Sequence, residues 1–172
     1  MKIKFLITIL FLLILANSNS LKKKINKAII ETFDIEHFEV EFILLPEDVV
    51  KSLPSNFSSG NFFKIIKENT FLGYAYVGKA PSKTDEFDFL VLLDKDLIVL
   101  KTKILAYRED YGGEISSKRW LKQFQGKSFN DELKYEQNIM AISGATISVR
   151  SMTLAMNNLL KSLNILIEKE IL

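Results

Sequence analysis

Apolar and polar residues alternate through the middle of the chain, which indicates β-strands. The ranges predicted as strands are 38–45, 62–67, 70–77, 87–93 and 97–107. The turn Asp94-Lys95-Asp96 joins the last two, and a polar loop is expected over 79–86. The pattern predicts an antiparallel meander with one face toward a core and the other partly solvated.

The last predicted strand illustrates the expected alternation. A strand places every second side chain on the same face. One face of this strand is expected to carry Ile98, Leu100, Ile104 and Ala106, and the other Lys101 and Lys103.

Apolar residues at helical spacing follow and precede this region. A long helix over 147–169 is expected to lie across the sheet, because its apolar residues recur every three or four positions. A basic amphipathic helix is expected over 21–33. Shorter helices are expected after Pro46 and over 116–124, the latter capped by Ser116 or Ser117. The fold class is therefore α+β: a meander sheet of about four or five strands packed against a long C-terminal helix and shorter helices.

The N-terminus has the composition of a targeting segment. Lys2 and Lys4 precede an unbroken apolar run over 5–15, and small polar residues follow. As a helix this run would extend about 18 Å, whereas a bilayer core is about 30 Å thick. A cleaved signal peptide is therefore favoured over an N-terminal anchor. The anchor stays open because Lys22, Lys23 and Lys24 oppose export of that flank.

Three parts are predicted on this basis: a signal peptide or anchor over 1–20, a helix, strand and linker over 21–59, and a domain over 60–172. The body of the protein is expected to be exported, at the periplasmic or extracytoplasmic face of the cytoplasmic membrane. Contact of Lys22, Lys23 and Lys24 with a membrane surface stays an open alternative to an ordinary solvated helix face.

Composition narrows the chemistry. The 172 residues include no cysteine and one histidine, which excludes disulfides, thiolate or multi-histidine metal sites and a Ser-His pair. The formal charge of +2 gives no reason to expect nucleic acid as a partner. No catalytic or metal-ligating residue is predicted.

The candidate chemistry lies in Ser143-Gly144-Ala145-Thr146-Ile147-Ser148, directly before the long helix. Gly144 allows close backbone approach, and the first N–H groups of a helix favour an anion. The helix dipole contributes only about 0.3–1 kcal/mol at an exposed site, so retaining a cofactor would need a covalent link or a buried ring. The ordinary alternative is that Ser143 or Thr146 is the N-cap of the helix.

Three upstream segments accompany this motif: LGYAYV over 72–77, YREDYGGEI over 107–115 and WLKQFQGK over 120–127. In this order, over about residues 60–165, the chain resembles the FMN-binding domain family. Its members include the flavin-carrying peripheral subunits of ion-translocating NADH:quinone and ferredoxin:NAD oxidoreductases, and single-domain exported relatives. The resemblance implies that a flavin transferase moves FMN from FAD to the threonine that closes the motif, here Thr146, as a phosphoester.

The resemblance also suggests roles for neighbouring residues. Ser143, Gly144, Ala145 and Ser148 would surround the phosphate. Trp120 and Phe124 would pack against the flavin ring, with ordinary core aromatics as the alternative. Glu109 and Glu114 would bond the polar edge of the flavin or pair with Arg108 and Arg119. Gly112 and Gly113 would let the backbone approach the ring, and Lys127 would meet the phosphate or the reduced flavin.

The function expected is that of an extracytoplasmic flavoprotein that exchanges electrons with a membrane-bound redox partner. It would be an electron-transfer protein or oxidoreductase subunit rather than a self-contained enzyme. The family usually places an aspartate three residues before the motif serine, where this chain has Met140. The alternative is therefore a module of the same fold in a membrane complex that binds FMN without a covalent bond or holds no flavin.

Overall fold

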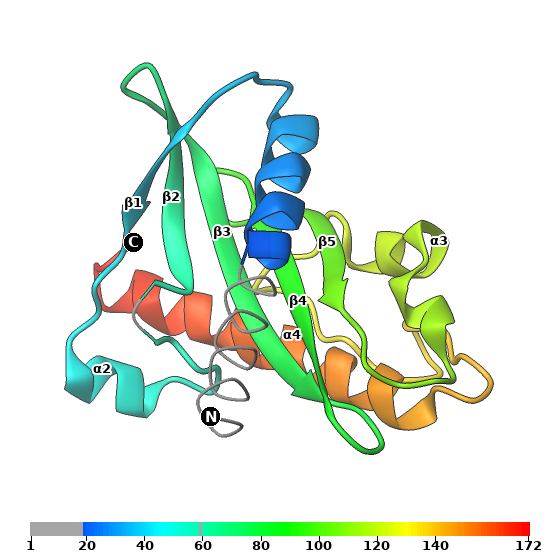
Figure 1. Cartoon of the computed structure of the whole chain (residues 1–172). Coiled ribbons are helices and arrows are strands. Elements are labelled where there is room, and N and C mark those ends of the chain that lie inside the picture. The colour runs from blue at the N-terminus through cyan, green and yellow to red at the C-terminus, as the bar shows by residue number, and fades with distance from the viewer. Residues whose placement is uncertain (1–18, 59) are drawn as a thin grey trace, which may run out of the picture.

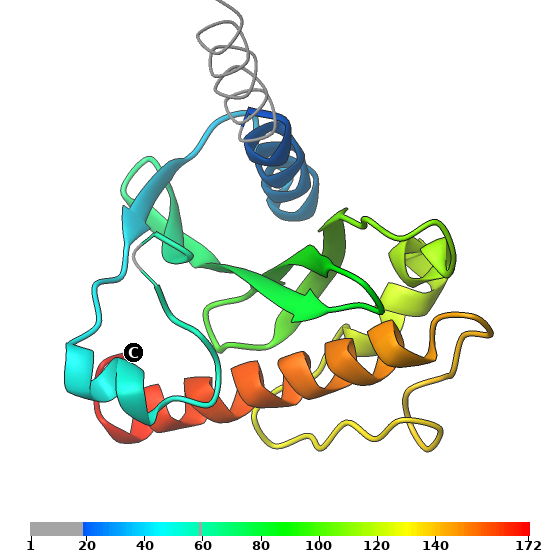
Figure 2. The same cartoon turned by 60° about the horizontal axis from the view of Figure 1, so that its bottom comes forward.

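The computed structural model describes residues 19–58 and 60–172. One antiparallel sheet contains five strands in chain order (Figure 1): β1 (Glu39–Phe42), β2 (Phe62–Lys67), β3 (Thr70–Pro81), β4 (Glu86–Leu93) and β5 (Val99–Ala106). The long helix α4 (Thr146–Glu168) crosses one face of this sheet, and the helix formed by residues 19–33 lies on the other face (Figure 2). The α+β class and the meander are thereby confirmed.

The predicted signal peptide or anchor over 1–20 lies outside the described residues except for its last two positions, which are helical. Within the part of the chain that is described, no helix is both long enough and apolar enough to cross a membrane.

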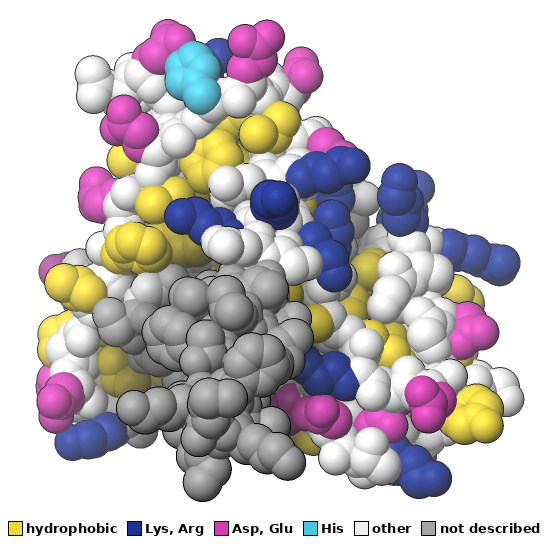
Figure 3. Space-filling view, viewed as in Figure 1, with side chains coloured by type: hydrophobic (Ala, Val, Ile, Leu, Met, Phe, Trp, Pro, Cys, Tyr) yellow, Lys and Arg dark blue, Asp and Glu magenta, His cyan; other side chains and the backbone are white. Residues whose placement is uncertain are grey.

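Apolar side chains fill the space on both faces of the sheet. On the α4 side, Phe89 and Val91 share a core with residues of α4 such as Met152 and Met156. On the other side, Leu90 and Leu92 share a smaller core with Ala28 and Ile29 of helix 19–33, as the continuous burial of β4 after Glu86 requires. The prediction of one partly solvated face was therefore wrong where this helix covers it. Lys and Arg side chains gather on the surface of that side (Figure 3).

Two irregularities change the alternation along β5. The pairing with β4 shifts register between Asp88 and Phe89 and again between Leu92 and Leu93. Val99 and Ile104 consequently face the α4 core, while Leu105 faces the other core. The predicted set of one-face residues over 98–106 was wrong, because each bulge reverses the order of inward and outward side chains.

The β3–β4 hairpin is longer than predicted. Lys79 pairs with Asp88 and Pro81 with Glu86, so the expected loop over 79–86 shrinks to 82–85. The Ser151 hydroxyl of α4 donates to the Pro81 carbonyl. The tip of the hairpin is therefore attached to the first half of α4.

Short helices complete the fold. They are α2 (Glu47–Ser52), the 3-10 helix η1 (Gly113–Ser116), α3 (Lys118–Leu121) and the 3-10 helix η2 (Lys122–Phe124). Pro46 immediately precedes α2. The predicted cap is confirmed at Ser117, whose hydroxyl accepts a hydrogen bond from the Trp120 N–H at 3.3 Å.

Candidate functional site

The first turn of α4 lacks the side-chain cap that most helices use. Its N-cap is Ala145, and no side chain accepts a hydrogen bond there. The Val149 N–H is the first to bond within the helix, to the Ala145 carbonyl at 2.9 Å. Within the described residues, the N–H groups of Thr146, Ile147 and Ser148 have no acceptor. Neither Ser143 nor Thr146 caps the helix, so the ordinary explanation for these hydroxyls is not observed.

A hollow of about 230 Å³ opens beside this turn. It is lined by Lys83, Tyr107, Glu109, Tyr111, Gly144, Ala145, Thr146, Ile147 and Ser148. These residues come from the β3–β4 turn, the loop after β5 and the start of α4. Thr146 is exposed. The hollow is smaller than most pockets that enclose a whole ligand, about 300–1,000 Å³, so a large ligand would extend into solvent.

Gly112 brings the loop after β5 against the turn before α4. Its φ is +76°, and a Cβ there would lie 2.6 Å from the Cβ of Ala145 and 3.2 Å from the carbonyl oxygen of Gly144. Only glycine fits both the backbone conformation and the space. Gly113, which was expected together with Gly112 to let the backbone approach a flavin ring, has no atom within 4 Å of such a Cβ.

A hydrogen bond also joins the end of β5 to the first turn of α4. The Tyr107 hydroxyl and the Ser148 hydroxyl lie 3.0 Å apart. Ser148 is buried, so this pair fixes the first turn of α4 relative to the end of β5.

Glu109 connects the hollow to the hairpin tip. Its Oε1 accepts from the Thr84 N–H at 2.6 Å, and its Oε2 accepts from the Thr84 hydroxyl at 2.9 Å. The Ser82 hydroxyl and the Thr84 N–H lower the pKa of Glu109 to about 2. Glu109 is therefore an anion at neutral pH and positions the turn that carries Lys83.

Arg108 takes no part in this contact. It pairs with the buried Asp88 and donates to the Glu86 carbonyl at 2.6 Å. Glu114 is exposed on η1 and does not line the hollow.

The aromatic pair expected at the flavin lies in the α4-side core. Trp120 is 4% exposed, Phe124 is fully buried, and their rings meet edge to face at 5.3 Å. The indole N–H donates to the Met140 carbonyl at 2.8 Å, and the Met140 N–H donates to the Gln123 side chain at 2.7 Å. These residues anchor the segment that leads to the motif and do not line the hollow.

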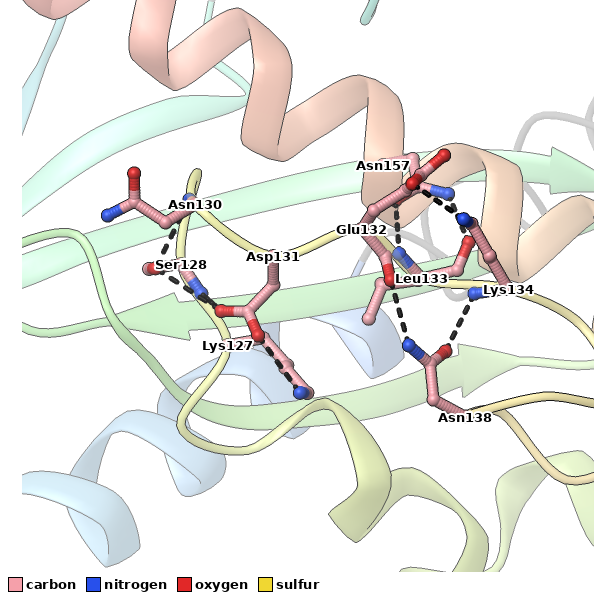
Figure 4. A network of polar contacts seen from close by, with 9 residues as sticks. All are labelled: Lys127, Ser128, Asn130, Asp131, Glu132, Leu133, Lys134, Asn138 and Asn157. Atoms are coloured by element: carbon pink, nitrogen blue, oxygen red, sulfur yellow. Dashed lines mark hydrogen bonds and ion pairs between the residues drawn. The ribbon is translucent and has the colours of Figure 1, made fainter.

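Lys127 lies at the opposite end of β5 from the hollow. Its carbonyl accepts from the N–H of Val99, the first residue of β5, whereas Tyr107 follows the last. An eight-residue strand extends about 25 Å. The Lys127 ammonium pairs with Asp131 at 3.0 Å, within the network of polar contacts drawn in Figure 4.

The structure thus brings five predicted residues to the hollow, namely Glu109, Gly144, Ala145, Thr146 and Ser148. Ser143 is exposed next to them. Four lining residues were not predicted from the sequence, namely Lys83, Tyr107, Tyr111 and Ile147. Tyr107 and Tyr111 stand inside the 107–115 motif, which was a usable signal, but nothing local marked Lys83.

All residues that line the hollow lie within a segment that matches a known family model. The family model for the FMN-binding domain matches residues 83–161, from the β3–β4 turn into α4. Among solved structures, the crystal structure of NqrC from Shewanella oneidensis is similar, with 17% sequence identity and a TM-score of 0.49. The similarity covers 66% of this chain and 61% of that one. A search of curated proteins found no match. The segment that builds the hollow, residues 83–161, belongs to the FMN-binding domain family.

Proposed function

We propose that this protein carries FMN at the start of α4, with the FMN phosphate esterified to Thr146, and exchanges electrons with a membrane-bound redox partner outside the cytoplasm. The observation that carries the proposal is the uncapped first turn of α4, where the exposed Thr146 borders an open hollow within an FMN-binding domain.

The residues present fit a phosphate. The free N–H groups of the first turn and the positive end of the helix favour an anion, and Lys83 adds a positive charge to the same hollow. Since the dipole contributes only about 0.3–1 kcal/mol, it cannot retain the cofactor alone. In the proposed transfer, Thr146 Oγ1 forms an ester bond to the phosphorus of the FMN half of FAD. The pyrophosphate bond breaks, AMP leaves, and the hydroxyl proton passes to the transferase or solvent.

The hollow also suits an aromatic ring at the surface. Tyr111 is 81% exposed, and Ile147 presents an apolar side chain beside Thr146. When bound, the flavin supplies the redox chemistry. The chain would hold the phosphate, orient the ring and leave one side of it open to the redox centre of a partner.

Covalent attachment is tested by co-expressing the full chain with a matching flavin transferase and measuring in-gel fluorescence after denaturation. We expect a labelled band and a flavin mass adduct on Thr146. Thr146→Ala should lose at least about 100-fold of the label because no acceptor hydroxyl remains, whereas Thr146→Ser should keep part of it.

Ser143→Ala is the matched control, because it removes a neighbouring exposed hydroxyl but leaves the acceptor. A label that survives Thr146→Ala, or a wild-type chain with unmodified Thr146, would contradict the covalent link.

Reversible FMN binding is the second candidate, and Met140 motivates it. This residue is 53% exposed, and its hydrogen bonds to Trp120 of α3 and Gln123 of η2 involve its backbone, which an aspartate would keep. Met140→Asp should raise the label if a carboxylate assists the transfer, while Ala141→Asp, at the exposed neighbour, should not. A yellow wild-type protein that bleaches on dialysis would instead favour reversible binding.

Export is a separate part of the proposal and rests on the apolar run over 5–15 behind Lys2 and Lys4. Fractionation of cells should recover the flavin-labelled chain outside the cytoplasm. Recovery of the chain in the cytosol would contradict export. The flavin label is measured separately in each fraction, because the label tests the FMN site and the location tests export.

A further inference from the structure

The open edge of the sheet carries a groove of about 390 Å³ that the FMN proposal does not use. It runs beside β5, between Glu31 of helix 19–33 and the helices α3 and η2. We call it the basic groove, because its lining includes Lys101, Lys103, Lys118 and Lys122. Of the described residues that line it, Glu31 is the one with a carboxylate.

Positive charge in this groove exceeds what the chain itself neutralises. Glu31 contacts Lys101 at 3.2 Å and Lys27 at 3.8 Å. Lys103, Lys118 and Lys122 form no ion pair with any residue that the structure describes. Partial burial lowers the pKa of Lys103, and nearby lysines lower it further against the opposing effect of Glu31. An added anion would relieve this repulsion.

One buried polar atom next to the groove lacks a partner. Thr102 is 7% exposed and lines the groove, and its buried hydroxyl has no hydrogen-bond partner among the described residues. A buried hydroxyl without a partner is uncommon in folded proteins. Because this hydroxyl is buried and Thr102 pairs with Val91 of the α4-side core, we expect the lysines rather than Thr102 to contact a lipid phosphate.

The same side of the molecule combines this charge with apolar groups. Helix 19–33 adds Lys22, Lys23, Lys24 and Lys27. At the other edge of the sheet, Phe42 is 52% exposed and contacts Phe63, which belongs to the core under that helix. Val40 lies two residues earlier on β1, on the same face, and is also exposed. Figure 3 shows basic side chains over the helix and beside it, with apolar side chains to the left.

We propose that this side of the protein docks onto a bilayer that contains anionic phospholipid. Lipid phosphates would enter the basic groove while Phe42 and Val40 contact the interface. A bilayer explains both features better than an acidic protein, because it offers phosphates to the lysines and an apolar interior to the exposed side chains on the same side of the molecule. In this orientation α4 lies on the side of the sheet away from the lipid (Figure 2).

The test compares binding of the full chain, prepared without flavin, to phosphatidylcholine vesicles with and without phosphatidylglycerol. The readout is the ratio of the two affinities, because the apolar N-terminal run contributes to both. We expect phosphatidylglycerol to raise affinity at least about 10-fold at low salt, and high salt to abolish the difference.

The groove variant replaces Lys101, Lys103, Lys118 and Lys122 by Gln. The matched control replaces Lys51, Lys134, Lys161 and Lys169 by Gln, which lowers the formal charge equally but acts on exposed lysines of other surfaces. The groove variant should lose at least about 10-fold of the affinity for anionic vesicles, and the control less than about 3-fold. Equal losses would overturn the proposal, because net charge alone would then explain the binding.

A variant with fewer substitutions distinguishes a loss of binding from a loss of folding. Lys118→Gln with Lys122→Gln removes two exposed lysines and no ion pair, so the melting temperature should not change while anionic affinity falls at least about 3-fold. Inorganic phosphate at the same phosphate concentration should not displace the vesicles. Displacement by phosphate, or equal binding to both vesicle types, would overturn docking onto lipid. Since no flavin is involved, either result is independent of the FMN proposal.

Discussion

Two regions beside α4 differ in whether their polar groups have hydrogen-bond partners. In the segment over 127–138, side chains and backbone bond to one another (Figure 4): Asn138 bonds to Lys134 and Glu132, and Asp131 bonds to Lys127 and Ser128. At the start of α4 the N–H groups have no partner among the described residues, and the nearby hydroxyl of Thr146 is exposed.

The comparison distinguishes polar groups that stabilise the fold from polar groups that remain free to bind a ligand. A satisfied network stabilises an irregular segment and has little left to offer a ligand. A helix start without a cap gives up about 1 kcal/mol of stability and keeps its donors free. Lys127 carries a charge suited to a flavin phosphate, but it belongs to the first kind of region, whereas Thr146 belongs to the second.

The largest effect is expected where the two loops of the hollow meet. Gly112→Ala should destabilise the protein by about 3 kcal/mol, because it forces a left-handed backbone on alanine and a clash with Ala145. Gly113→Ala is the matched control and should change stability by less than about 0.5 kcal/mol, since its Cβ meets nothing. Urea unfolding measures both, and equal losses would mean that the contact with Ala145 does not hold the loop.

Mutations that break hydrogen bonds to the segment over 127–138 should lower the stability of the protein without changing flavin labelling. Asn157→Ala removes the Oδ1 and Nδ2 atoms that bond the N–H and C=O of Leu133 at 2.9 and 2.8 Å, and should cost about 2 kcal/mol. Asn158→Ala makes the same change in helix propensity, but no side-chain hydrogen bond of Asn158 is found in the described chain. Flavin labelling should be unchanged in both variants. A loss of label in Asn157→Ala would show that the hydrogen-bonded segment also affects the flavin site, and would contradict the distinction between the two regions.

A smaller effect should appear when the helix start receives a negative charge of its own. Thr146→Glu should stabilise the flavin-free protein by about 0.5 kcal/mol relative to Thr146→Gln, because the carboxylate meets the positive end of α4. Urea midpoints at low and high salt measure the difference, which salt should reduce. No difference between Glu and Gln would argue that this turn has no preference for anions.

The smallest effect at neutral pH is a change in acid sensitivity. The pKa of Glu109 is about 2 in the folded protein against an ordinary value of 4.5, so its hydrogen bonds stabilise the fold above pH 4.5 and lose that effect as the pH falls toward 2. The stability difference between wild type and Glu109→Gln should therefore shrink across this range, as followed by urea unfolding. A difference that stays constant with pH would contradict the bonding of Glu109 to the hairpin tip.

Much of the fold could be predicted from local patterns. The range of β2 matches the predicted strand over 62–67, and α4 covers Thr146–Glu168 against a prediction of 147–169. Such elements follow from side chains two, three or four residues apart, which one stretch of sequence contains. Bulges in β5 and the burial of one sheet face under helix 19–33 depend on distant segments, and the prediction failed there.

The candidate site divides in the same way. Thr146 could be singled out because the small-residue motif and the helix that follows it are adjacent in the chain. Trp120, Phe124 and Lys127 are also near one another in sequence. In the structure, however, the two rings lie in the α4-side core and the lysine lies at the far end of β5. Lys83 and Tyr111 join the hollow from separate loops; the 107–115 motif contains Tyr111, but no local pattern indicated Lys83.

By itself, then, the sequence determined the strands, the long helix and the hydroxyl at its start, since periodicity and adjacency are local properties. Only the tertiary structure decided that this hydroxyl is exposed, that Gly112 rather than Gly113 makes the close approach, and that lysines of β5 and α3 share one groove. The physical reason is that strand register and helix packing are set by the sum of contacts over the whole chain, and they determine which distant side chains meet.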